Sequence, residues 1–251
     1  MNDALPPIVV AKDGPVSTVT LASPASANAL GAAMVEALHE AVDTATENGT
    51  RVLVIEAEGR AFCAGLGLAG LIGETDASML LRLVRIELLL EKLWYGPLLS
   101  VAVVRGAAAG AGADLVMATT VRYATAAASL RFPGSEFGAV LGVRRLAECT
   151  NSAFAAEAAA TGRAIRSQEA ERLGIWKRLD DDGPGVGAEI ARDLVRRAPE
   201  TVAAIQREAT ARGSAPDPMG SLVRSLAARP GLAGRIREMN ERRLRAKKTT
   251  V

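Results

Sequence analysis

Runs of apolar residues separated by small or polar turns predict an alternation of strands and helices in the first half of the chain. Residues 8–10 and 16–21 flank Asp13-Gly14, which is a strong hairpin signal. Residues 51–55 and 98–104 are almost continuously apolar, a pattern typical of strands buried on both faces. We expect two further short strands, at residues 120–124 and 129–132.

Helical periodicity is found between the expected strands and in most of the chain after residue 144. One helix is expected to open at Asn28-Ala29-Leu30 and to end near Asn48-Gly49. A long amphipathic helix is expected from Ser78, as N-cap, to about Trp94, before Gly96-Pro97. Further helices are expected at residues 114–118, 144–149, 152–161, 167–173, 188–198 and 200–212, with a final Arg-rich helix through residue 245. The pattern predicts an α/β core with an all-helical appendage.

Composition narrows the class of protein. With 251 residues and 49% apolar residues the chain can bury a large core, and the net charge of +2 gives no reason to expect a nucleic-acid partner. Two cysteines and no metal-ligand spacing lead us to expect no disulfide framework, metal or redox cofactor. The first residues lack signal-peptide character, and charged residues interrupt the apolar stretch 78–93. We therefore expect a cytoplasmic protein with no membrane contact.

The chain has a single histidine, His39, which excludes Ser-His-Asp and Cys-His hydrolases as well as His-based metal sites near the glycine-rich turns. His39 itself is expected on a helix surface. Cys63 is expected to be packing material, because no base is available to activate it. Any catalysis must then come from carboxylates and backbone groups.

Two small-residue turns follow the two buried strands. Residues 60–66 come after the first strand, and residues 106–114 come after the second. Small residues let the backbone approach a ligand, and each turn could supply one N–H group to the same oxygen atom. The sequence therefore predicts an oxyanion cradle made from both turns.

Three motifs, taken together, carry a family resemblance. The order Asn28-Ala29-Leu30, then residues 59–65 (GRAFCAG), then residues 104–112 (VRGAAAGAG) resembles the crotonase (enoyl-CoA hydratase/isomerase) superfamily over about residues 8–180. The resemblance implies a core of repeated ββα turns at residues 1–187 and a helical region at residues 188–251 that builds homotrimers, often paired into hexamers. It also implies that the ligand is a coenzyme A thioester.

The resemblance assigns roles residue by residue. It places the thioester oxygen between the backbone N–H groups of Leu66 and Ala111, and coenzyme A against Ala25, Ala27 and Ala64. It matches the two catalytic glutamates of the family's hydratases with Asp114 and Glu136. Two carboxylates can share one water, with Glu136 as the principal acid/base and Asp114 as its partner. We therefore expect hydration of a 2-enoyl thioester, and loss of turnover in Glu136→Gln.

Three departures from the family pattern leave alternatives open. Asp114 is one methylene shorter than glutamate, an acidic residue is missing at residues 66–68 (LGL), and the loop 137–145 is shortened. The alternatives are an enoyl-CoA isomerase of the same fold and a non-catalytic acyl-CoA binder. In the simplest reading, Asp114 is a helix-start carboxylate and Glu136 an ordinary surface residue.

Two other sequence patterns give weaker evidence of function. Residues 101–114 resemble a dinucleotide fingerprint, but Leu115 stands where its third glycine belongs. The basic run near the C-terminus is expected to be a solvated helix face, or alternatively to contribute one contact to coenzyme A phosphates from a neighbouring subunit. Its members are Arg235, Arg237, Arg242, Arg243, Arg245, Lys247 and Lys248.

Overall fold

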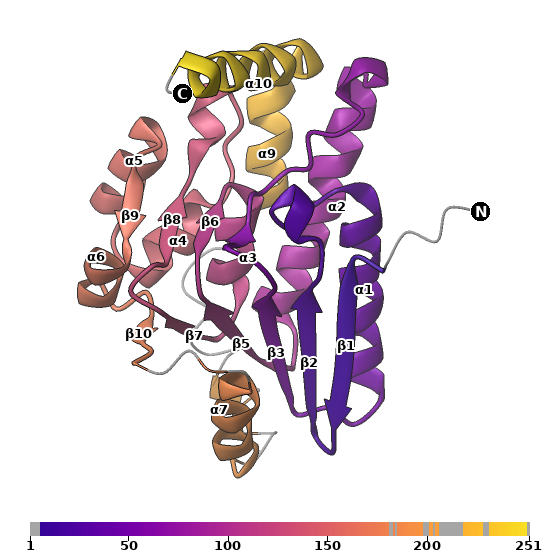
Figure 1. Ribbon diagram of the computed structural model, residues 1–251, viewed down its shortest axis with the longest axis vertical. Helices are drawn as coiled ribbons and strands as arrows, with labels where there is room; N and C mark the ends of the chain where they lie inside the picture. Colours follow the sequence, from indigo (N-terminus) through magenta and orange to yellow (C-terminus); the bar gives the residue numbers. More distant parts are fainter. Residues whose placement is uncertain are drawn as a thin grey trace.

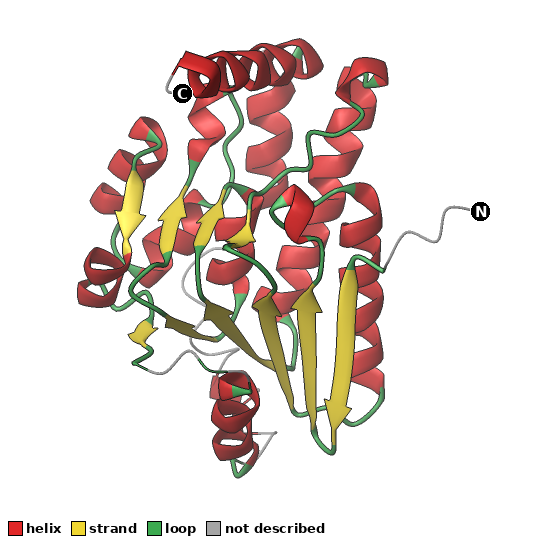
Figure 2. Cartoon of the chain, viewed as in Figure 1, coloured by secondary structure: helices red, strands yellow, loops and turns green. Residues whose placement is uncertain are grey.

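The computed structural model describes residues 6–180, 183, 185–197, 201–202, 204–205, 218–227 and 231–249. Strands of two sheets form the centre of the molecule, with helices packed around them (Figures 1 and 2). The expected helix at 200–212 lies largely outside the described residues.

The first sheet has six strands in the order β1-β2-β3-β5-β7-β10. Only the β1/β2 hairpin is antiparallel, and every other neighbouring pair runs parallel. Its strands are β1 (Ile8–Asp13), β2 (Val16–Leu21), β3 (Val52–Ala57), β5 (Leu99–Val104), β7 (Val121–Ala124) and β10 (Lys177–Arg178). The expected β1/β2 hairpin and the expected strands β3, β5 and β7 are confirmed.

The second sheet has four short strands in the order β4-β6-β8-β9. They are β4 (Ala61–Cys63), β6 (Ala107–Ala109), β8 (Ser129–Arg131) and β9 (Ala164–Arg166). Strands β3, β5 and β7 of the first sheet are each followed by one strand of the second: β4, β6 and β8. Each turn of the chain thus adds one strand to each sheet, and the expected ββα spiral is confirmed.

Helices surround this spiral. The longer ones are α1 (Ala32–Glu47), α2 (Asp76–Tyr95), α5 (Ser152–Thr161), α7 (Val186–Val195), α9 (Pro218–Ala227) and α10 (Leu232–Thr249). The shorter ones are α3 (Ala111–Ala118), α4 (Val143–Cys149), α6 (Ser167–Arg172) and the 3₁₀ turns η1 (Pro24–Ser26), η2 (Leu71–Gly73) and η3 (Pro133–Glu136). Helix α10 crosses one end of the molecule, above the strands of the second sheet (Figure 1).

Two apolar cores lie on opposite faces of the first sheet. On β3, Leu53 and Ile55 join the core that holds α1 and α2, whereas Val52 and Val54 join the core against α7. Strand β3 is therefore buried on both faces, as its continuous apolar run predicts. A third core links α2 with Leu222 of α9 and Ile236 of α10. No described helix is long and apolar enough to cross a membrane.

Four helix starts differ from the sequence expectation by two residues or more. Helix α3 begins at Ala111 and α7 at Val186, where residues 114 and 188 were expected. The N-cap of α2 is Thr75, while Ser78 is the third helical residue and closes a reciprocal capping box with Thr75. Helix α1 begins at Ala32, after the extended N-cap Gly31, while Asn28 has a left-handed backbone (φ 54°) and is fully buried. The motif that carries Asn28 is thus a structural turn ahead of the helix.

Asn28 ties that turn to the strand that precedes the first cradle. Its Oδ1 accepts a hydrogen bond from Ser23 N–H (2.8 Å), and its Nδ2 donates to the carbonyls of Glu58 (2.8 Å) and Ala61 (3.0 Å). An aspartate would keep the acceptor but lose both donors, and would place its charge against two buried carbonyls. We expect Asn28→Asp to lower the free energy of unfolding by about 3 kcal/mol.

The measurement is urea unfolding beside Asn48→Asp. Asn48 is exposed and its Oδ1 only accepts hydrogen bonds, from Thr50, so the same chemical change there should alter stability by less than about 0.5 kcal/mol. Equal stabilities of the two variants would contradict the role of Asn28.

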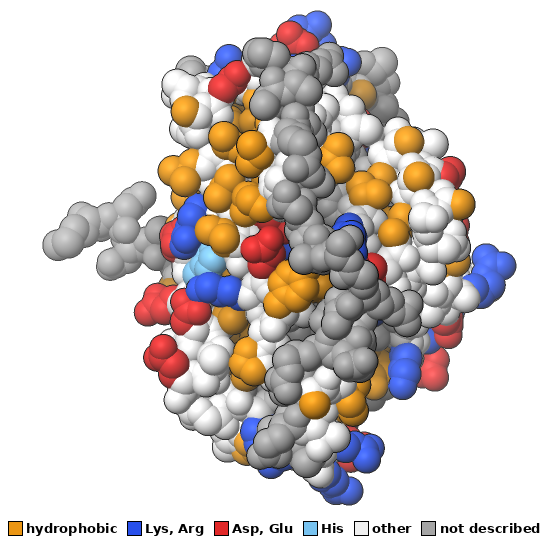
Figure 3. Space-filling view, turned by 180° about the vertical axis from the view of Figure 1, so that it is seen from behind, with side chains coloured by type: hydrophobic (Ala, Val, Ile, Leu, Met, Phe, Trp, Pro, Cys, Tyr) orange, Lys and Arg blue, Asp and Glu red, His pale blue; other side chains and the backbone are white. Residues whose placement is uncertain are grey.

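The expected surface position of His39 is wrong. Its ring is only 4% exposed, and Nε2–H donates to the carbonyl oxygen of Arg85 on α2 (3.0 Å). Burial lowers the pKa of His39, so the ring is neutral at physiological pH. The edge of the histidine shows in pale blue between basic side chains on the back of the molecule (Figure 3). Arg85, whose carbonyl accepts from the ring, pairs through its side chain with Glu36. The ring therefore joins α1 to α2.

Candidate active site

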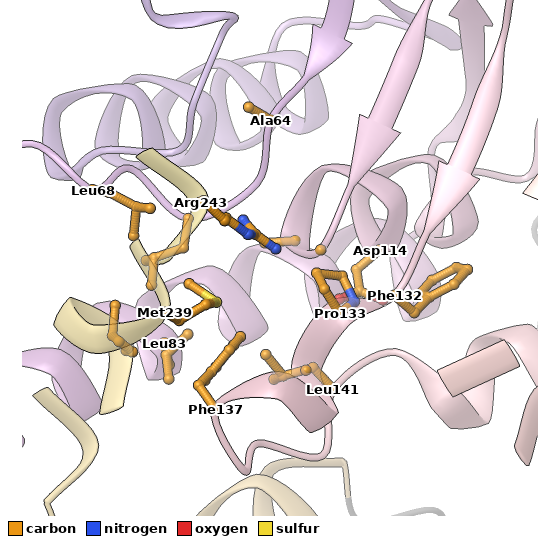
Figure 4. A pocket seen from close by; sticks show the side chains of 15 residues that line it. Ala64, Leu68, Leu83, Asp114, Phe132, Pro133, Phe137, Leu141, Met239 and Arg243 are labelled. Carbon is orange, nitrogen blue, oxygen red and sulfur yellow. The ribbon is translucent and has the colours of Figure 1, made fainter. Parts of the chain in front are cut away.

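A pocket lies where the second sheet, α3, η3 and α10 meet (Figure 4). Its walls are mostly apolar, with one carboxylate and one guanidinium. The lining residues are Ala64, Leu66, Leu68, Leu83, Gly110, Ala111, Asp114, Phe132, Pro133, Gly134, Phe137, Leu141, Ile236, Met239 and Arg243. The pocket thus contains Leu66, Ala111, Asp114 and Ala64 from the expected site.

The two expected oxyanion donors come from adjacent loops. Leu66 bridges Leu30 in parallel fashion, so that Gly65 C=O and Gly67 N–H are used and Leu66 N–H is left over. Ala111 is the first residue of α3, where N–H groups have no helical partner. No hydrogen bond among the described residues uses either N–H.

Gly65 shows how closely the two loops approach. A Cβ built on Gly65, whose φ is 88°, would lie 2.4 Å from Ala109 C=O and 3.3 Å from Ala111 N. Only glycine permits this contact, and it brings the residue that precedes Leu66 against the start of α3. Leu66 and Ala111 therefore both line one pocket. That their two N–H groups hold the same oxygen stays a prediction.

Of the three alanines matched to coenzyme A, only Ala64 lines the pocket. Ala64 is exposed at the pocket and donates its N–H to the carbonyl of Ala27 (2.9 Å). Ala27 has a left-handed backbone (φ 52°), and Ala25 is exposed in η1. Ala25 and Ala27 do not line the pocket, so their contact with coenzyme A stays a prediction.

Asp114 is the acidic residue of the pocket. It lies one turn into α3, its side chain is only 2% exposed, and its Oδ1 has no hydrogen-bond partner. Burial raises the pKa of Asp114 to about 7; the charge of Arg145 opposes the rise and that of Glu87 adds to it. A carboxyl group that titrates near neutrality can both take and return a proton.

Glu136 is not brought into the pocket. Its Oε1 accepts from Arg131 Nη2 (2.5 Å) and its Oε2 from Arg243 Nη2 (3.1 Å). The residues of this turn that line the pocket are Pro133 and Gly134, at its start. The structure therefore does not place Glu136 and Asp114 around one water, and it gives Glu136 the role of holding Arg243.

Helix α10 supplies one side of the pocket, which the sequence did not predict. Arg243 lines the pocket, Arg235 Nε donates to Phe137 C=O (2.8 Å), and Arg237 Nη1 donates to the carbonyls of Leu71 and Glu74. The expected solvated helix face is wrong for these three arginines. The side chains of Lys247 and Lys248 lie outside the described residues.

Cys63 agrees with its expected packing role. It is fully buried, and a Cβ on Gly112 would lie 2.7 Å from its Cβ. Burial raises the pKa of its thiol to about 12, so it is neutral.

Comparison with known proteins gives the family. The enoyl-CoA hydratase/isomerase family model matches residues 11–218. The chain belongs to the enoyl-CoA hydratase/isomerase family. It is 31% identical to a probable enoyl-CoA hydratase of Bacillus subtilis over 208 residues, covering 79% of this chain and 80% of that protein.

Solved structures agree with the enoyl-CoA hydratase/isomerase fold. A putative enoyl-CoA hydratase/isomerase from Bordetella parapertussis superposes with a TM-score of 0.84 at 34% identity, covering 93% of this chain and 98% of that one. An enoyl-CoA hydratase from Bacillus anthracis superposes with a TM-score of 0.74 at 27% identity, covering 80% of this chain and 81% of that one. The family supports an enzyme acting on acyl-CoA thioesters and does not decide between hydratase and isomerase.

Proposed function

We propose that the protein is an enoyl-CoA isomerase that converts a 3-enoyl thioester into the 2-enoyl thioester, with Asp114 as its single acid/base. The observation that carries the proposal is the combination of two unused backbone N–H groups and one buried carboxyl in the same apolar pocket. Among the described residues lining the pocket, no other has a carboxyl group.

The chemistry requires one carboxylate. Asp114 takes a proton from C2 of the thioester, and the electron pair moves to the thioester oxygen between Leu66 N–H and Ala111 N–H. Those donors stabilise the negative charge as it forms, an effect worth about 3 kcal/mol per donor in comparable sites. The protonated Asp114 then gives the same proton to C4, and the double bond comes to lie between C2 and C3.

Hydration of a 2-enoyl thioester is the second candidate, favoured by the names of relatives. It needs a group to hold and activate water besides the group that protonates the α-carbon. Glu136 could serve only after leaving Arg131 and Arg243, which hold both its oxygens. We therefore rank hydration second, in contrast to the expectation from sequence.

Glu136→Gln separates the two candidates. For an isomerase that uses Asp114 alone, we expect the variant to change kcat for a 3-enoyl thioester by less than about threefold, since Glu136 acts only through Arg243. For a hydratase that uses Glu136, kcat for crotonyl-CoA should fall by about 10²–10⁴-fold.

The measurement is ultraviolet absorbance of the conjugated enoyl thioester, which appears on isomerisation and disappears on hydration. Wild type and Glu136→Gln are each assayed with trans-3-hexenoyl-CoA and crotonyl-CoA. Saturable binding by calorimetry without either change in wild type would contradict both reactions and indicate a non-catalytic acyl-CoA binder.

The trimer or hexamer implied by the family resemblance remains part of the proposal, as do the absence of a cofactor and the cytoplasmic setting. Described residues of α9 and α10 pack on α2 and on Phe137 of the same chain. Ile236, Met239 and Arg243 of α10 thereby line the pocket of their own chain.

A further inference from the structure

A buried ion pair lies behind the carboxylate of Asp114. Glu87 of α2 and Arg145 of α4 are joined by two hydrogen bonds, from Arg145 Nη2 to Oε1 (2.5 Å) and from Nη1 to Oε2 (3.3 Å). Their side chains are 3% and 4% exposed. Together with Asp114, three ionisable side chains from three helices are thus withdrawn from water.

The start of α4 is pressed against Asp114. A Cβ built on Gly142, the N-cap of α4, would lie 1.6 Å from Asp114 Oδ1. Gly142 has φ 65°, so both the backbone and the space demand glycine. The same short helix therefore forms the wall behind the carboxylate and carries Arg145 three residues later.

Two polar atoms in this cluster lack partners. Asp114 Oδ1 and Arg145 Nε are both buried without a hydrogen bond. In a medium of low dielectric, a cation that is paired but not fully satisfied still acts on a nearby carboxyl. Arg145 favours the ionised form of Asp114, and Glu87 favours the protonated form.

We propose that the Glu87–Arg145 pair is a positioning element that sets the protonation state of Asp114, with Arg145 promoting ionisation and Glu87 limiting it. This inference rests on the proposed role of Asp114 as the acid/base. Neither residue touches the substrate pocket, since neither is among its lining residues. The pair acts through Asp114 and through the start of α4.

Other charged groups around Asp114 leave this assignment intact. Arg243, from α10, lines the same pocket, but Glu136 accepts a hydrogen bond from it. The Cys63 thiol, from β4, lies against Gly112 and is neutral because burial raises its pKa to about 12. Among the described residues, Glu87 and Arg145 are the charged groups that shift the pKa of Asp114.

The test uses two changes with opposite expected signs. Glu87→Gln removes the opposing carboxylate and keeps the arginine, so the pKa of Asp114 should fall and the pH–kcat/KM profile should move to lower pH. The double variant Glu87→Leu/Arg145→Met removes both charges in an apolar form that buried sites tolerate. The charge of Arg145 affects the pKa of Asp114 more than that of Glu87, so the profile of the double variant should move to higher pH.

A shift of one pH unit corresponds to a tenfold change in rate well below the midpoint. Arg145→Lys keeps the charge and should leave the midpoint between those of the other two variants. A purely structural pair would change the height of the profile without moving its midpoint. Folded variants with unmoved midpoints would overturn the proposal.

A second readout does not depend on turnover. The infrared carbonyl band of protonated Asp114, identified by its loss in Asp114→Asn, can be titrated in wild type and variants by difference spectroscopy. Opposite shifts of this titration with no isomerase activity would support the pair and reject the proposed function. If the titration does not move in the variants while isomerase activity is normal, the proposed function is supported and the role of the pair is rejected. If the double variant does not fold, the shift in Glu87→Gln alone decides.

Discussion

Asp114→Asn is expected to lower kcat for a 3-enoyl thioester by about 10²–10⁴-fold while leaving thioester binding within about threefold. Asparagine has nearly the same shape and can neither accept nor return the proton. The proposed oxyanion donors, the N–H groups of Leu66 and Ala111, are unchanged. The measurements are steady-state kinetics and calorimetry with a saturated acyl-CoA.

The same substitution should stabilise the fold above neutral pH. The folded protein holds Asp114 at a pKa of about 7, above its ordinary value of 3.8, so ionisation opposes folding. Below about pH 4 the carboxyl is protonated in both the folded and the unfolded protein, so it does not lower the free energy of unfolding. As pH rises the loss of stability grows, and above pH 7 it stays constant at about 4 kcal/mol. Asparagine escapes that penalty.

Thermal unfolding of wild type and Asp114→Asn at pH 5 and pH 8 checks this. We compare the free energy of unfolding of Asp114→Asn with that of wild type at each pH. We expect this difference to favour the variant by at least about 1 kcal/mol more at pH 8 than at pH 5. A gain in stability accompanied by a loss of activity would show that the loss does not come from unfolding. An active variant, or one less stable at pH 8 than at pH 5 relative to wild type, would contradict the role of Asp114.

The sequence predicts those parts of the fold where the hydrophobic pattern is strong. Strands β3 and β5 have long apolar runs, and α2 has a clear helical period, so all three were predicted to within a few residues. Strands β4 and β6 have only three residues each, and β6 consists of alanines alone. Their pairing depends on the spiral, which places each strand beside the equivalent strand of the next turn.

The sequence predicts which residues lie together where backbone geometry determines this and not where side-chain direction does. The two turns before Leu66 and Ala111 are marked by their small residues, and the structure brings them together. In the 3₁₀ turn η3, Gly134 faces the pocket and Glu136 faces two arginines, and nothing in the sequence tells these directions apart.

Buried polar residues were the main failure of the sequence analysis. Glu87 is one of the charged residues that interrupt the apolar stretch 78–93, yet it is buried against Arg145, which lies 58 residues further along the chain. His39 was missed for the same reason, since its partner is a carbonyl of another helix. Pairing over such distances gives no local signal.

Ala111→Pro is expected to lower kcat/KM by about 10²–10³-fold, because it deletes one oxyanion donor. Proline is tolerated at the first position of a helix, where the N–H has no helical acceptor. Gly110, before it, lies outside the α region that a following proline disfavours, in a conformation open to glycine (φ 52°, ψ −127°). The ring carbon that replaces the hydrogen of this N–H enters the space reserved for the thioester oxygen.

Ala32→Pro is the matched control. Ala32 is the exposed first residue of α1, follows Gly31 in an extended conformation, and is not a lining residue of the pocket. Both variants should unfold within a few degrees of wild type, and only Ala111→Pro should lose turnover and weaken binding of the thioester. Full activity in a folded Ala111→Pro protein would remove Ala111 N–H from the mechanism. Equal losses in both variants would mean that proline damages the fold and not the oxyanion site. A loss confined to Ala111→Pro would show that catalysis depends on a backbone group that side-chain substitution leaves in place, because every residue type except proline supplies the same N–H.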